Sequence, residues 1–160
     1  MTAEKVVIIT AGGSGIGAEA ARRLKRDGFH VAILSSSGKG EALAHELGGI
    51  GLTGSNQSDD DVKHLVELTM NRWGRIDGLV NSAGHGPRAD LLEIPDSDWH
   101  KGLDVYFLNA VRSARLVAPI MTEQGGGSIV NISSAWAFEP ASIFPTSAVF
   151  RAGLASFTKI

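Results

Sequence analysis

The fold of this chain follows from one stretch near its start, Val6-Val7-Ile8-Ile9-Thr10-Ala11-Gly12-Gly13-Ser14-Gly15-Ile16-Gly17. Its first residues are apolar and β-branched without alternation, which is typical of a parallel strand buried on both faces. Glycines follow at once, and then residues 18–26 carry alanine and leucine at helical spacing, with Gly28 placed to end the helix. A strand, a glycine-rich turn and a helix in this order predict the start of a βαβ unit.

The same alternation continues along the chain. Further strands are predicted at residues 31–34, 50–53, 79–80 and 129–132. A short helix is predicted to end at residue 47. Longer helices are predicted over residues 62–73, 99–121 and 147–160. Strands and helices that alternate in this way form right-handed crossovers, so we predict an α/β fold with a Rossmann-type doubly wound parallel sheet, as a single domain over residues 1–160.

The composition excludes several classes of protein. The chain has 15 Lys and Arg against 17 Asp and Glu, a balance that leaves no basic excess for nucleic-acid binding. It has no cysteine, and its histidines show no metal-ligand spacing, so we predict neither disulfides nor a metal site. No apolar run reaches the roughly 18 residues of a membrane span, and the start shows no signal-peptide pattern. We therefore expect a cytoplasmic protein that binds neither nucleic acid nor membrane.

The glycines between the first strand and the first helix predict a phosphate-binding loop. Glycine lets the backbone approach a pyrophosphate closely, and it directs the N–H groups of the helix N-terminus at it. The other interpretation is a tight turn without a ligand, because a glycine pattern alone is weak evidence. The loop has no Gly-Lys-Ser/Thr ending, which excludes the phosphate loop of nucleoside-triphosphate-binding proteins.

Three motifs lie in order along the whole chain. They are residues 10–17, then Asn81-Ser82-Ala83-Gly84 preceded by Trp73-Gly74-Arg75-Ile76-Asp77, and finally Ile129-Val130-Asn131-Ile132-Ser133-Ser134. Together they resemble the glycine loop, the Asn-Asn-Ala-Gly element and the serine-ending strand of the short-chain dehydrogenase/reductase family, with Ala11 in place of the first glycine. Members of this family are longer. The resemblance therefore implies that the C-terminal part of the usual domain, with the last strands and a substrate-capping segment, is absent from these residues.

The resemblance implies a dinucleotide-binding domain and, residue by residue, a set of cofactor contacts. The residues at the corresponding positions are Thr10, Gly12, Gly13, Ser14, Gly15, Ile16, Gly17, Ser35, Ser36, Asn56, Asn81, Ala83, Gly84 and Arg151.

The end of the second strand favours NADP as the cofactor. Proteins that bind NAD place a carboxylate there, which accepts hydrogen bonds from the adenosine ribose. This chain has Ser35, Ser36 and Ser37 with Lys39 close behind, so nothing acidic repels a 2′-phosphate. We therefore predict NADP, with NAD as the alternative. The plainer interpretation is that these serines are ordinary loop residues.

The positions that carry the chemistry of this family are mostly substituted. The family uses a tyrosine as proton donor, a lysine one helical turn later, an upstream serine and an asparagine on the preceding helix. The resemblance places Ser134 at the serine, Ser147 at the tyrosine, Arg151 at the lysine and Tyr106 at the asparagine. Serine is a poor proton donor and arginine keeps its proton. Of the family's catalytic features, only the serine at Ser134 and the positive charge at Arg151 are therefore retained.

Tyr106, the only tyrosine of the chain, suggests a relocated proton donor. The small Ser147 leaves room for a phenol from the neighbouring helix, and a guanidinium beside a phenol favours loss of the phenol proton. In this hypothesis Tyr106 gives the proton, Arg151 tunes it and holds the ribose, and Ser134 orients the substrate oxygen. The competing interpretation is that Tyr106 packs in a degenerate site.

Two smaller questions stay open at the level of the sequence. His85 follows the Asn-Ser-Ala-Gly motif, and it either faces the nicotinamide or lies in solvent. Trp136 and Phe138 either line a substrate pocket or pack in the core.

The resemblance implies an NADP-dependent oxidoreductase that transfers hydride between the nicotinamide and a small-molecule carbonyl or secondary alcohol. The alternative is a redox-inactive dinucleotide-binding protein used in sensing or assembly. Family members pair two long helices across a two-fold axis, so the full-length protein is expected to form a homo-dimer or homo-tetramer. Residues 99–121 and the helix from Ser147 would form that contact, although their small residues equally suit packing within one chain.

Overall fold

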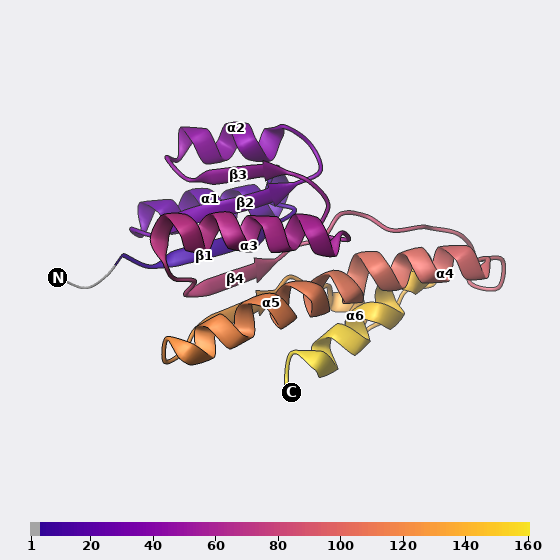
Figure 1. The fold of residues 1–160 in the computed structure, drawn as a ribbon. Helices are drawn as coiled ribbons and strands as arrows, with labels where there is room; N and C mark the ends of the chain where they lie inside the picture. Colours follow the sequence, from indigo (N-terminus) through magenta and orange to yellow (C-terminus); the bar gives the residue numbers. More distant parts are fainter. Residues whose placement is uncertain (1–3) are drawn as a thin grey trace.

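A parallel sheet of five strands lies at the centre of the computed structural model, which describes residues 4–160 (Figure 1). Its strands are β1 (Val6–Thr10), β2 (His30–Ser35), β3 (Ile50–Thr53), β4 (Gly78–Asn81) and β5 (Ser128–Asn131), in the spatial order β3-β2-β1-β4-β5. All pairings are parallel, and β1 pairs with β2 on one side and with β4 on the other. The direction of winding therefore reverses at β1, which confirms the predicted doubly wound sheet.

Helices connect the strands and lie on both faces of the sheet (Figure 1). They are α1 (Gly15–Arg26), α2 (Lys39–Glu46), α3 (Asp59–Trp73), α4 (Asp96–Leu103), α5 (Asn109–Glu123) and α6 (Pro145–Phe157). A π-helical turn, η1 (Asp104–Leu108), joins α4 to α5, and a 3₁₀ turn, η2 (Ala135–Ala137), follows β5.

Two predicted helices differ in detail from the structure. The helix predicted at residues 99–121 begins earlier, at Asp96, and its hydrogen-bond pattern changes to the wider π form over η1 before α5 begins. The helix predicted at residues 147–160 begins at Pro145 and ends at Phe157. Proline suits this first position because its fixed φ matches the helix and its missing N–H would have no helical partner there.

Two apolar layers hold the sheet between its helices. On one face, Ile8 of β1 packs with Leu65 of α3 and Val117 of α5. On the other face, Val7 and Ile9 pack with side chains of α1 and α2. Because β1 is central and covered on both faces, its sequence is continuously apolar.

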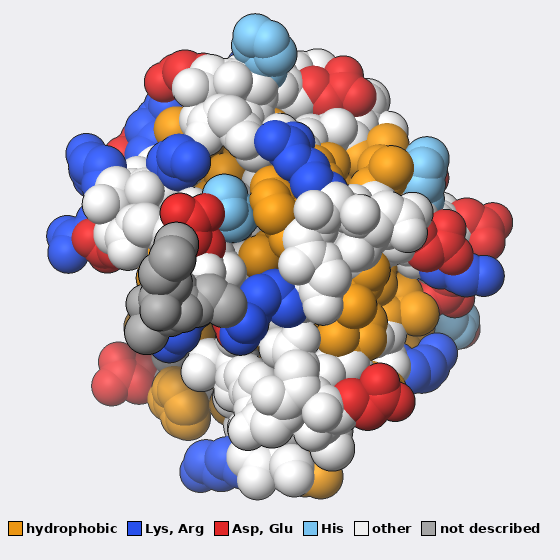
Figure 2. All heavy atoms as spheres, turned by 60° about the vertical axis from the view of Figure 1, so that its left-hand side comes forward, with side chains coloured by type: hydrophobic (Ala, Val, Ile, Leu, Met, Phe, Trp, Pro, Cys, Tyr) orange, Lys and Arg blue, Asp and Glu red, His pale blue; other side chains and the backbone are white. Residues whose placement is uncertain are grey.

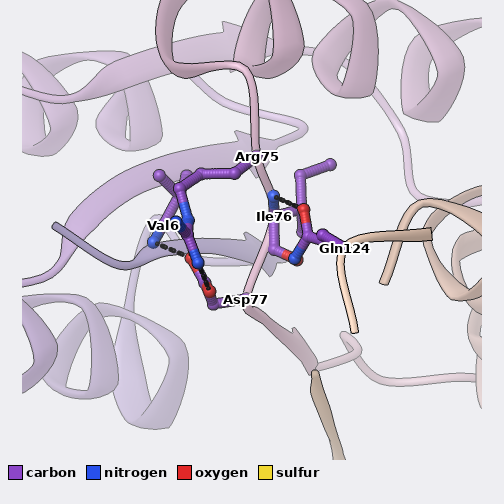
Figure 3. Close-up of polar contacts among 5 residues, drawn as sticks. All are labelled: Val6, Arg75, Ile76, Asp77 and Gln124. Atoms are coloured by element: carbon purple, nitrogen blue, oxygen red, sulfur yellow. Dashed lines mark hydrogen bonds and ion pairs between the residues drawn. The ribbon is translucent and has the colours of Figure 1, made fainter. Parts of the chain in front are cut away.

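A polar clamp ties β1, β4 and the end of α5 together at the amino end of the sheet (Figure 3). The Asp77 carboxylate accepts the N–H of Val6 at 2.8 Å and pairs with the Arg75 guanidinium. The hydrogen bonds from Arg75 lower the pKa of Asp77, against the opposing effect of burial. Gln124 exchanges two hydrogen bonds with the Ile76 backbone, at 3.1 and 2.6 Å. The Arg-Ile-Asp part of the second motif therefore stabilises the end of the sheet where the strands begin.

Helix α6 packs closely against α4. The contact is tight at Gly102, where a Cβ would lie 2.8 Å from Cβ of Thr146 and 3.2 Å from the ring of Phe150. Of the small residues expected at a subunit contact, Ala148 is buried within the chain whereas Ala152 is exposed. Helix α6 thus uses part of its small-residue face within this chain and presents another part to solvent.

The surface mixes charges of both signs. Acidic and basic side chains are intermingled over the face that Figure 2 shows, in keeping with 15 basic and 17 acidic residues. Among residues 4–160, the helices lack the length and apolar character needed to cross a membrane.

Candidate functional site

A cavity of about 630 Å³ lies at the carboxyl ends of the strands. Its wall is built by the loops that follow all five strands and by Arg151 of α6. None of the lining residues in the described part of the chain is Asp or Glu. In doubly wound sheets, the carboxyl ends of the strands beside the reversal of strand order are where ligands bind. This cavity is therefore the candidate site.

The glycine-rich loop brings its backbone directly against the end of β2. A Cβ on Gly13 would overlap the hydroxyl of Ser35 and lie 3.1 Å from the backbone nitrogen of Gly40. Gly15 has a φ of +54°, which favours glycine. Both glycines line the cavity, so the bare backbone at this point forms part of its wall.

Two other glycines of the loop act by packing, whereas Ala11 lines the cavity. Gly12 and Gly17 lie outside the cavity lining, and a Cβ on Gly17 would lie 2.9 Å from the carbonyl oxygen of Ala11. Ala11, which replaces the first glycine of the resembled motif, has a φ of +49°. An L-residue other than glycine is strained in this left-handed region, so the loop keeps the glycine conformation without the glycine.

The N-terminus of α1 opens into the cavity without a compensating group. In the described chain no side chain caps it, its first turn holds no acidic residue, and Ser14, Gly15 and Ile16 line the cavity. Helix α3 contrasts with it, because the Ser58 hydroxyl accepts the N–H of Asp61 and three aspartates occupy the first turn. The first N–H groups of α1 and its positive dipole end are thus available to an anion.

The three serines at the end of β2 all line the cavity, but they differ in exposure. Ser35 is buried and its hydroxyl lies beside the backbone of Gly13. Ser36 and Ser37 line the cavity from exposed positions. Lys39 begins α2 and is not among the lining residues, although the sequence suggested a role for its ammonium.

Hydrogen bonds between loops fix the carboxyl end of β4. The Thr10 hydroxyl donates to the carbonyl of Ser82 at 3.1 Å and accepts the N–H of Ser82 at 3.2 Å. Asn56 donates to the same carbonyl at 3.0 Å and also lines the cavity. Asn81 is buried outside the lining, where it donates to the side-chain oxygen of Asn131 at 2.8 Å and so links β4 to β5. Thr10 and Asn81, two of the predicted cofactor contacts, therefore lie outside the cavity lining and hold the strand ends that form it.

The segment after β4 contributes directly to the cavity. Ala83, Gly84 and His85 all line it, so His85 faces the site from an exposed loop.

Arg151 supplies the fixed charge of the cavity wall. It is 9% exposed, and one of its terminal nitrogens donates to the carbonyl of Ile132. No carboxylate among residues 4–160 forms an ion pair with it. Burial lowers the pKa of Arg151, with Tyr106 opposing that effect. The guanidinium still keeps its proton at neutral pH, because an arginine titrates far above that range.

Tyr106 lies in η1 directly behind Arg151. Its side chain is 5% exposed, and the centroid of its ring lies 4.9 Å from the guanidinium carbon of Arg151. Its hydroxyl accepts the N–H of Gly86 at 2.6 Å. The structure therefore brings Tyr106 and Arg151 together, but the hydroxyl is turned to the loop after β4 and Tyr106 is not a lining residue.

The three serines near Arg151 have different surroundings. Ser133 lines the cavity, whereas the Ser134 hydroxyl caps η2 by accepting the N–H of Trp136 at 3.3 Å. Ser147 is buried in the first turn of α6, away from the lining. Of the four predicted catalytic positions, Arg151 alone lines the cavity in the described chain.

Aromatic residues join the loops beyond the site. The rings of Trp136 and Phe144 stack with centroids 4.2 Å apart, and the guanidinium of Arg88 lies 4.2 Å from the centroid of Phe144. Phe138 is 76% exposed. Trp136 thus packs between loops, Phe138 faces solvent, and neither lines the cavity.

Several lining residues were not among the sequence predictions, including Ser55, Gln57 and Ser133. Each one follows closely on a strand. Because the carboxyl ends of parallel strands meet at one edge of a sheet, listing the residues after every predicted strand would have found them. Residues 4–160 contain no cluster of three or more His, Cys, Asp or Glu residues that could hold a metal ion.

The sequence of this chain is similar to known proteins over almost its whole length. A family model described as short chain dehydrogenase matches residues 5–160. Dehydrogenase/reductase SDR family member 4 of Oryctolagus cuniculus is 34% identical over 164 residues, which are 98% of this chain and 63% of the relative. The 7alpha-hydroxysteroid dehydrogenase of Bacteroides fragilis is 34% identical over 166 residues, which are 97% of this chain and 63% of the relative. The chain thus spans less than two thirds of the length of these relatives.

Solved structures share the fold. L-sorbose reductase from Gluconobacter frateurii, complexed with NADPH and L-sorbose, superposes with a TM-score of 0.89 at 29% identity, over 98% of this chain and 62% of that one. A 7 alpha-hydroxysteroid dehydrogenase complexed with NADH and 7-oxo glycochenodeoxycholic acid superposes with a TM-score of 0.86 at 28% identity, over 96% of this chain and 62% of that one.

Proposed function

The chain belongs to the short chain dehydrogenase family, and we propose that the whole protein is an NADP-dependent oxidoreductase that acts on a small-molecule carbonyl or secondary alcohol. One observation carries the proposal: a single cavity joins the open N-terminus of α1 to the fixed positive charge of Arg151. The first suits a pyrophosphate, and the second suits a substrate that brings negative charge to the site.

The residues of the cavity fit a dinucleotide. The N–H groups of Ser14, Gly15 and Ile16 would hold its pyrophosphate, and the bare backbone at Gly13 allows the close approach. Ala83 and Gly84 present backbone, without long side chains, to the part of the cavity between the loop and Arg151. When NADPH is bound, it supplies the hydride.

NADP fits the end of β2 better than NAD. Ser36 and Ser37 line the cavity there, and no acidic lining residue repels a 2′-phosphate. NADPH is bound in the sorbose reductase and NADH in the hydroxysteroid dehydrogenase, so both cofactors occur among similar proteins. Dissociation constants for the two cofactors test the proposal. Ser36→Asp should weaken NADP more than NAD, and a clear preference of the unaltered protein for NAD would contradict it.

The side chains around Arg151 have distinct proposed roles. Arg151 supplies a positive charge to the bound substrate, because it remains charged in a largely buried place. Ser134 lies outside the lining but directly follows the lining residue Ser133. Its hydroxyl accepts the N–H of Trp136, which leaves its own proton free for a substrate oxygen. The Tyr106 oxygen is already engaged as the acceptor of the Gly86 N–H. Its buried position outside the lining favours a tethering role over proton donation.

A second candidate function is a redox-inactive dinucleotide-binding protein. It is favoured by Ser147, which occupies the proton-donor position of the resembled motif and is buried outside the cavity lining.

Cofactor binding and hydride transfer by the full-length protein separate the two candidates. NADPH oxidation against a panel of carbonyl compounds supports the oxidoreductase. NADP binding without turnover on any member of the panel favours the second candidate, and the absence of any dinucleotide binding contradicts both.

We also propose that the full-length protein is a cytoplasmic homo-dimer or homo-tetramer. The exposed small face of α6 around Ala152 supports a helix contact between subunits. Sedimentation as a monomer would contradict the assembly, and cell fractionation tests the location.

A further inference from the structure

Arg151 carries a positive charge that the protein itself does not neutralise. It is nine-tenths buried, no acidic residue of the described chain lines the cavity, and none forms an ion pair with it. Removing a charge from water is costly unless a counter-charge or hydrogen bonds replace the water. A lysine in this place could release its proton, but an arginine keeps it. An occupant with negative charge would therefore be stabilised here.

The surroundings of the guanidinium leave hydrogen-bond donors for a ligand. A guanidinium has five N–H donors, and the one bond found for it in the described chain goes to the carbonyl of Ile132. The ring of Tyr106 covers one face at 4.9 Å. The side chain also contributes to the cavity lining. The remaining N–H groups form a planar fork, and a carboxylate matches such a fork with two parallel hydrogen bonds.

This charge is separate from the phosphate loop. Arg151 is bonded to Ile132, just after β5, whereas the loop follows β1, and β4 lies between these two strands. Neighbouring strands are about 4.8 Å apart, so the two places are on the order of 10 Å apart. A pyrophosphate on α1 would thus leave Arg151 without a counter-charge.

We propose that Arg151 binds a carboxylate of the substrate, so that the substrate is an oxo acid or a hydroxy acid. This inference rests on the proposed oxidoreductase function. A carboxylate is charged at neutral pH and matches a cation that is present before any reaction begins. A neutral ketone or alcohol would offer negative charge only as the reaction proceeds.

Calorimetry on the NADP-saturated full-length protein tests this with matched pairs of probes. Oxamate is compared with oxamide and benzoate with benzamide, since each pair differs in charge but hardly in shape. At least one carboxylate should bind tighter than its amide by about tenfold or more, the factor for a hydrogen bond to a charged group. Arg151→Met should abolish the preference and Arg151→Lys should retain part of it. Arg115→Met removes an exposed arginine of α5 outside the cavity, and it should change nothing.

Several results would overturn the proposal. Equal affinities for acid and amide would overturn it, and so would a preference that survives Arg151→Met. Carboxylate binding that is measured on the NADP-free protein and is lost when NADP is added would assign the guanidinium to the cofactor. NADP binding at the α1 loop checks that Arg151→Met is folded. If it is not, protection of Arg151 from phenylglyoxal by benzoate but not by benzamide, mapped by mass spectrometry, supports the site. Lack of that protection overturns it. A carboxylate preference without NADPH oxidation would refute the oxidoreductase and keep the anion site.

Discussion

Replacing Tyr106 by phenylalanine separates the two roles that its position allows. The ring stays, and with it the contact at 4.9 Å to the guanidinium of Arg151. The change removes one atom, the hydroxyl oxygen that accepts the N–H of Gly86 at 2.6 Å.

The magnitude follows from the burial of this bond. A buried donor left without its acceptor costs about 1–3 kcal/mol. Tyr106 is only 5% exposed but the donor residue Gly86 is half-buried, so the cost lies toward the lower end of this range. For a domain of this size, each kcal/mol lowers the melting temperature by about 2–4 °C. We therefore expect Tyr106→Phe to be less stable by this amount and the loop at Gly86 to loosen.

The assay pairs this variant with a control on the same loop. Thr146 is fully buried and its hydroxyl donates to the carbonyl of Pro87 at 3.1 Å, so Thr146→Val loosens the neighbouring residue without touching Tyr106. Melting temperature and NADPH turnover are measured for both variants of the full-length protein. If Tyr106 is a tether, turnover should fall to a similar, modest extent in both.

Two outcomes would refute this reasoning. An unchanged melting temperature for Tyr106→Phe would show that the bond to Gly86 does not hold the loop. A fall in turnover on the order of 10²-fold or more, confined to Tyr106→Phe, would identify its hydroxyl as the relocated proton donor.

Two further predictions concern stability and the loop. Because Arg75 lowers the pKa of Asp77, this pair stabilises the fold above the unfolded carboxylate pKa of about 3.9, and the contribution is lost as pH falls through the lower folded value. Asp77→Asn should therefore lower the melting temperature at neutral pH and approach the unaltered protein below about pH 4; a constant difference across a pH series would contradict this. Gly13→Ala should weaken NADP binding by about tenfold or more, because its Cβ would overlap Ser35 at the cavity wall. Gly15→Ala has free space around the new methyl but a φ of +54°, so it should mainly lower the melting temperature, whereas Gly13→Ala should mainly weaken NADP binding. A larger loss of NADP binding in Gly15→Ala, with a larger loss of melting temperature in Gly13→Ala, would contradict the packing argument.

The sequence by itself determined the sheet and the position of the phosphate loop. The continuous apolar residues of β1 and the glycines after it are local patterns, and each follows from one physical requirement, burial on both faces or close backbone approach. Helix ends were less well determined. The sequence of residues 99–121 did not predict the π-helical turn at Asp104–Leu108, because the spacing of apolar residues along a helix is nearly the same with or without one wider turn.

The tertiary structure alone decided which predicted site residues meet the cavity. The bond from Arg151 to the carbonyl of Ile132 joins residues 19 positions apart, and the bond from Gly86 to the Tyr106 oxygen joins residues 20 positions apart. Both depend on how α6 and η1 pack against the loops after β5 and β4. Motif positions also could not show that the hydroxyl of Ser134 caps a 3₁₀ turn while Ser133 lines the wall. Spacing fixes which residues occur near a strand end, whereas side-chain direction and burial arise from packing between segments distant in sequence. For that reason the uncompensated charge of Arg151 becomes visible only in the folded chain.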